Sequence, residues 1–98
     1  MIKDMQVVTA ATDTGKSTIV VNAVKAVSTN TWYYDTATTV AGLIGVTYNT
    51  AITTANWTAL TANGLEITPT AGDKYIRVVE VDSNNKPVAV GDALLNIG

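Results

Sequence analysis

The stretch that most constrains the fold is residues 72–97, whose pattern predicts a β-hairpin at the end of the chain. Its first arm, Tyr75–Val81, is rich in β-branched and aromatic residues, which fit a pleated, half-buried surface better than a helix. Residues 82–86 then supply Asp, Ser and Asn, the side chains that favour turns. A two-stranded hairpin is only marginally stable by itself, so the upstream segments must complete a sheet.

The second arm is expected at residues 88–90 and 93–97, with Gly91 and Asp92 interrupting it as a bulge or kink. In the first arm, side chains alternate between the two faces of the sheet. One face carries Ile76 and Val78 with Glu80, and the other carries Val79 and Val81 with Arg77. Because both faces are apolar, we expect one to line the core and the other to be covered by something else.

The remaining chain predicts further short strands separated by turn-forming residues, about seven strands in all. The upstream strands are expected at residues 6–10, 17–24, 32–35, 57–60 and 65–68. Residues 36–56 predict a long loop with a short strand or a poorly regular edge, and Asn63-Gly64 predicts a tight turn. The predicted fold is an all-β, immunoglobulin-like β-sandwich with little or no helix. We expect residues 1–5 to form a mobile N-terminal arm and residues 6–98 a single domain.

Composition excludes several functions. The 98 residues have a net charge of −2 and a pI near 4.7, which argues against nucleic acid because no basic surface could replace phosphate counterions. The chain has no cysteine and no histidine, so thiolate chemistry, zinc sites and the usual proton shuttle are absent. No stretch is long enough to cross a bilayer, and the start lacks the apolar run of a signal peptide. We therefore expect a protein that is not an enzyme, needs no cofactor or metal, binds no membrane and is made in a cytoplasm.

Two motifs have both an ordinary and a functional interpretation. Gly15-Lys16-Ser17 matches the end of a phosphate-binding loop, but the glycine required five positions before Gly15 is replaced by Ala10, so a hairpin turn is favoured. Trp32 and Trp57 could form a sugar-stacking platform with the neighbouring tyrosines. In a chain without phenylalanine the core needs these aromatic residues, which favours burial.

From Trp32 onward the order of motifs resembles small immunoglobulin-like or fibronectin-like modules of tailed-phage structural proteins and of some bacterial surface proteins. The matching segments are Trp32-Tyr33-Tyr34, residues 57–59, residues 67–72 and the strand and turn from Tyr75 to Lys86. The resemblance implies a structural role in a virion, as a capsid decoration, head fibre or tail protein. The favoured hypothesis is an outer capsid decoration protein that binds the major capsid protein or another virion protein; the alternative is a carbohydrate-binding or adhesive surface module.

The residues expected to make such contacts are apolar ones without an evident role in the core. Met1, Ile2 and Met5 lie in the predicted arm and would contact the capsid. Val79 and Val81 lie on the second apolar face of the hairpin and would form the seam of a homo-oligomer.

Overall fold

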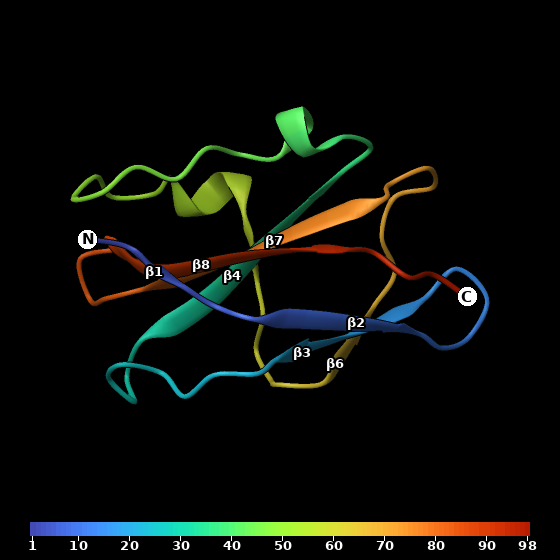
Figure 1. The fold of residues 1–98 in the computed structure, drawn as a ribbon, viewed down its shortest axis with the longest axis horizontal. Helices are drawn as coiled ribbons and strands as arrows, with labels where there is room; N and C mark the ends of the chain where they lie inside the picture. The colour runs from blue at the N-terminus through green and yellow to red at the C-terminus, as the bar shows by residue number, and fades with distance from the viewer.

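The computed structural model describes residues 1–98 and has two β-sheets packed face to face (Figure 1). The five-stranded sheet has the order β1-β8-β7-β4-β5, and the three-stranded sheet has the order β2-β3-β6. The strands are β1 (Lys3–Asp4), β2 (Val7–Ala11), β3 (Ser17–Val21), β4 (Thr31–Ala37), β5 (Thr58–Ala59), β6 (Leu65–Ile67), β7 (Tyr75–Val81) and β8 (Pro87–Leu94). The only helical pieces are two three-residue 3₁₀ turns, η1 (Val40–Gly42) and η2 (Thr54–Asn56). The prediction of an all-β sandwich with little helix is confirmed.

The chain moves between the sheets after β1, β3, β5 and β6, while β2–β3 and β7–β8 are antiparallel hairpins within one sheet. This alternation places inward side chains of both sheets in one core, as in immunoglobulin-like sandwiches. The central members of that core are Ile19, Val21, Ile76 and Val78, each at most 2% exposed. Trp32 packs in the same cluster at 8% exposure.

The terminal hairpin forms as predicted, but its irregularity lies elsewhere. β8 continues through Gly91 and Asp92, and the register shift falls between Glu80 and Val81 on β7. Gly91 has a different reason to be glycine, since a Cβ built there would lie 1.9 Å from the carbonyl oxygen of Met5. Gly91 therefore permits another backbone to approach closely; it does not mark a bulge or kink.

The predicted mobile arm is wrong over residues 3–5. Lys3–Asp4 forms β1, which pairs in parallel with β8, and the Met5 N–H donates to the Val90 carbonyl over 2.9 Å. The Met5 side chain is only 6% exposed and belongs to the main core. Because Met5 follows β1 directly, burying its side chain fixes the strand on the edge of the sheet.

Residues 38–57 form the long loop that was predicted, without an edge strand. The loop crosses the outer face of the five-stranded sheet, seen as the green segments above β4 and β7 in Figure 1. Under it lies a second, smaller apolar cluster of Trp57, Val79 and Val81, against which Ile44, Val46 and Ile52 pack. The chain itself thus covers the second apolar face of β7.

Asn63-Gly64 is a turn with Gly64 at φ +85°, yet it joins β5 and β6 of different sheets and closes no hairpin. The Asn63 side chain accepts from the Val21 N–H over 2.9 Å and donates to the Val21 carbonyl over 2.8 Å. Asn63 therefore pairs with the end of β3 as a neighbouring strand would.

Candidate interaction surface

Of the five residues predicted to contact a partner, the structure leaves two accessible. Met1 is 95% exposed and Ile2 is half-buried. Met5 lies in the main core, and Val79 and Val81 are fully buried beneath the loop. The predicted oligomer seam on β7 is therefore wrong, because residues 38–57 already occupy that face.

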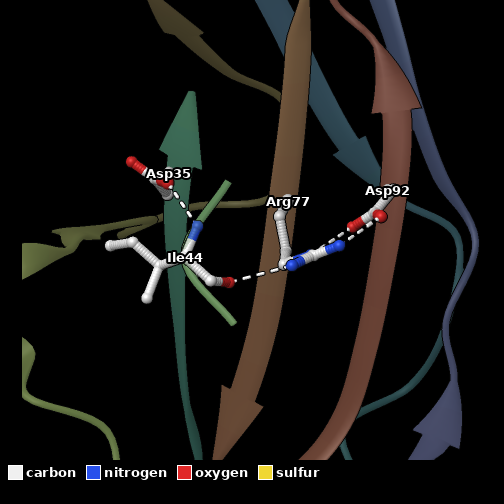
Figure 2. Close-up of polar contacts among 4 residues, drawn as sticks. All are labelled: Asp35, Ile44, Arg77 and Asp92. Atoms are coloured by element: carbon white, nitrogen blue, oxygen red, sulfur yellow. Dashed lines mark hydrogen bonds and ion pairs between the residues drawn. The ribbon is translucent and has the colours of Figure 1, made fainter. Parts of the chain in front are cut away.

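The loop is held in place by Arg77, which projects from the outer face of β7 (Figure 2). Its guanidinium donates to both carboxylate oxygens of Asp92 on β8, from Nε over 2.7 Å and from Nη2 over 2.8 Å. The remaining Nη1 donates to the Ile44 carbonyl over 2.9 Å, and the Ile44 N–H donates to Asp35 on β4 over 2.9 Å. Both backbone groups of Ile44 are thus fixed to the sheet, and with them the loop that shields the small cluster.

The chemistry of the hydrogen bonds around Arg77 suits a structural role in holding the loop better than a catalytic role. The hydrogen bond to Asp92 raises the pKa of Arg77, so the guanidinium stays charged near neutral pH and is not suited to act as a general acid or base. The Asp92 carboxylate is engaged by two charge-assisted hydrogen bonds. An open depression of about 380 Å³ lies beside it, lined by Asp4, Met5 and Val46 among others. No group of three acidic, histidine or cysteine side chains gathers there or elsewhere to hold a metal.

Gly15 and Lys16 lie in the turn between β2 and β3, and Ser17 is the first residue of β3, as the hairpin interpretation predicts. The Gly15 N–H donates to the Gly98 carbonyl over 2.7 Å and the Lys16 N–H to the Asp13 carbonyl over 2.9 Å. The Lys16 ammonium lies 3.1 Å from Thr68 Oγ1 and 3.9 Å from a carboxylate oxygen of Glu66. The amides that would cradle a phosphate therefore bond within the chain.

The aromatic residues do not form an exposed platform. Trp32 lies in the main core and Trp57 under the loop, at 8% and 7% exposure. Tyr33 and Tyr34 are half-buried and pack against these clusters, and burial raises the pKa of Tyr34. Tyr48, at 63% exposure, is the one aromatic side chain that is largely open to solvent.

One buried polar residue was not singled out as a candidate site. Glu80 on β7 is 2% exposed, and of the eight carboxylate side chains it alone is buried. Its carboxylate accepts from the Ala26 N–H over 2.9 Å and from the Asn30 side-chain amide over 2.7 Å. Alternation along the strand placed Glu80 on the same face as Ile76 and Val78 without showing that this face points into the core, and that shared face was the available signal.

The termini lie at opposite ends of the longest axis of a body measuring 37 × 25 × 21 Å (Figure 1). At the C-terminal end, the Gly98 N–H donates to the Lys16 carbonyl over 3.0 Å, and the Gly98 carbonyl accepts from Gly15. In the loop that follows β3, Val24 is 94% exposed and Val27 56% exposed, and Val24 lines a pocket together with Lys3 and Asp4 of β1. Val24 is therefore a largely exposed apolar side chain beside the N-terminal strand.

No helix is long and apolar enough to cross a membrane.

No protein-family model matches the sequence, and a search among curated proteins finds no match. Two solved structures share the fold. One is the crystal structure of domains 7, 8 and 9 of the S-layer protein SbsC, and the other is the structure of domains 4–9 of the surface layer protein SbsC. Each matches 97% of this chain with a TM-score of 0.65 and 22% sequence identity. This chain spans 27% of the first structure and 14% of the second.

These comparisons support the fold that was predicted and refine the resemblance. The neighbours are domains of a surface-layer protein, and surface proteins are one of the two settings in which such modules were expected. A phage origin has no support among them.

Proposed function

We propose that this chain is a structural, non-catalytic module of a surface-layer protein, one unit in a series of similar β-sandwich domains. The observation that carries the proposal is the match of 97% of the chain to a fraction of a multidomain surface-layer structure. The position of the termini supports it, because domains joined end to end need entry and exit points at opposite ends.

The surface chemistry fits this role. Charged residues make up 14% of the chain, and a weakly charged surface favours association between neighbouring modules. The half-buried and buried aromatic residues give the alternative of a carbohydrate-binding module little exposed stacking area. Of the arm residues expected to contact a capsid, only Met1 and Ile2 stay accessible, since Lys3–Asp4 and Met5 belong to the sheet and its core.

The direct test is the location of the domain on cells. Antibodies raised against the purified 98-residue domain are applied to intact source cells and, separately, to phage particles produced by those cells. We expect labelling of the outer surface of intact cells and none of the particles. Labelling of particles alone, or labelling that appears only after the cells are lysed, would refute the proposal.

A further inference from the structure

Glu80 is a buried carboxylate that forms no ion pair in the structure. Ion pairs form between Lys16 and Glu66 and between Arg77 and Asp92, and neither includes Glu80. Both hydrogen bonds that Glu80 accepts, from Ala26 and from Asn30, end on the same oxygen, Oε2. Because a buried charge is costly unless it is paired, the free side of this carboxylate is a strong site for a cation.

The second oxygen, Oε1, accepts no hydrogen bond from the protein, yet it is not sealed in the core. Only one side-chain polar atom is both fully buried and unpaired, and it is the indole Nε1 of Trp32. Because Glu80 Oε1 is unpaired, it is not fully buried and keeps contact with solvent. Glu80 lines a pocket of about 160 Å³ near the N-terminal end of the sandwich. Most of the wall is apolar, formed by Met5, Val24, Val88 and the alanines at 23, 26 and 89. Lys3 and Asp4 of β1 complete the lining, and their charges cancel.

We propose that this pocket binds a primary alkylammonium group, the group carried by a lysine side chain. Its methylene stem would lie against the apolar wall, and its ammonium would donate to Glu80 Oε1 and supply the missing positive charge.

Other cations fit this pocket less well. A guanidinium binds best with a carboxylate that offers both oxygens, and Oε2 is already occupied by Ala26 and Asn30. A quaternary ammonium has no N–H to donate. A calcium ion needs six or more oxygen ligands, of which Glu80 offers one.

The source favoured by the pocket's position is a lysine of a neighbouring module, and this choice of source rests on the proposed function. The pocket opens beside β1, where a preceding module would join, and Val24 at its wall is 94% exposed. A free polyamine carries the same chemical group and is the other possible source.

The test is a titration of the 98-residue chain with n-butylammonium chloride at constant ionic strength, followed by ¹H–¹⁵N NMR. We expect saturable shifts of the Ala26 amide and the Asn30 side-chain amide, the two donors to Glu80. n-Butanol has the same stem without the charge, and n-butyltrimethylammonium has the charge without an N–H. Both should bind about tenfold more weakly or worse, because n-butanol lacks the charge that strengthens the hydrogen bond to Glu80 and n-butyltrimethylammonium lacks the donor.

The matched variant is Glu80→Gln. Its amide oxygen can still accept from Ala26 and Asn30, while its NH₂ group faces the pocket and repels an ammonium donor. We expect the variant to fold and to lose n-butylammonium binding about tenfold or more. Lys3→Gln removes a cation from the lining and should bind n-butylammonium more tightly than the wild type.

The proposal is overturned if n-butanol binds the wild type as tightly as n-butylammonium, a result that does not depend on any variant folding. It is also overturned if shifts are absent from Ala26 and Asn30, or if Glu80→Gln binds n-butylammonium unchanged. Parallel titrations with Nα-acetyl-lysine methylamide and putrescine distinguish the sources, because tighter binding of the former favours a protein lysine. These results are independent of cell labelling, so alkylammonium binding can hold even where the surface-layer proposal fails.

Discussion

Gly91→Ala is the sharpest test of how the N-terminal strand is held. The added Cβ would lie 1.9 Å from the Met5 carbonyl oxygen, 2.9 Å from its carbonyl carbon and 3.0 Å from Val7 Cγ2. The two nearest atoms are backbone, so no side-chain rotation can relieve the clash. Either β8 shifts, or β1 and Met5 move away from it.

The cost can be bounded from these two responses. Forcing a methyl group into a packed site costs about 1–3 kcal/mol. Releasing β1 would expose the Met5 side chain, worth about 1.5–3 kcal/mol, and break the bond from the Met5 N–H to Val90, worth about 1 kcal/mol. The protein takes the cheaper route, so we expect the free energy of unfolding to fall by about 1–3 kcal/mol.

Urea unfolding followed by tryptophan fluorescence measures this change, since both tryptophans are buried. Gly45→Ala is the matched control, because Gly45 is exposed, has no positive φ and leaves open space where its Cβ would lie. The control should stay within about 0.5 kcal/mol of the wild type, or gain slightly from reduced chain entropy. Equal stabilities of the two variants would refute the argument that Gly91 serves the close approach of Met5.

Three further outcomes follow from the contacts above. Arg77→Lys keeps the charge, but a lysine cannot donate to the Asp92 carboxylate and to the Ile44 carbonyl at the same time in this geometry, so limited proteolysis should cleave residues 43–57 faster than in the wild type. Unchanged cleavage would show that Arg77 does not hold the loop. Asn63→Asp removes the donor to the Val21 carbonyl and should lower the free energy of unfolding, measured with urea, by about 1–3 kcal/mol. The control Asn22→Asp, at an exposed site, should change it little, and equal losses in the two variants would contradict the role given to Asn63. Burial raises the pKa of Tyr34 above 10.0, so Tyr34 ionises at a lower pH in the unfolded chain than in the folded one, and the free energy of unfolding should fall as pH rises above about 10. Tyr34→Phe should reduce this alkaline loss of stability in urea unfolding measured at several pH values, and an identical pH profile would exclude Tyr34 as its source.

Much of the fold was predictable because its signals are local. Tyr75–Val81 matches β7 residue for residue, and the turn after it contains Asn85 at φ +59°, the conformation that Asn tolerates. β3 and β6 were also placed, since short β-branched runs bounded by turn residues identify strands without knowledge of their partners.

What could not be predicted depends on contacts between distant segments. β1 has two residues and gains its structure only by pairing with β8, some 86 positions away by the register of Lys3 with Ala89. Gly91 has the same sequence signature whether it marks a bulge or a close approach, and only the position of Met5 decides between them. The cover of Val79 and Val81 likewise comes from a loop with no regular pattern of its own.

The same non-local contacts fix both ends of the chain, which bears on how a series of such modules would behave. Terminal residues normally fray unless they are tied to the rest of the domain. Here Lys3–Asp4 is paired with β8, and Gly98 is bonded through its N–H and its carbonyl to the β2–β3 turn. In the array that we propose, the chain would therefore enter and leave each module at points held by the sandwich itself. The Glu80 pocket lies at one of these fixed ends, so a lysine received there would restrain the angle between modules and not merely their separation.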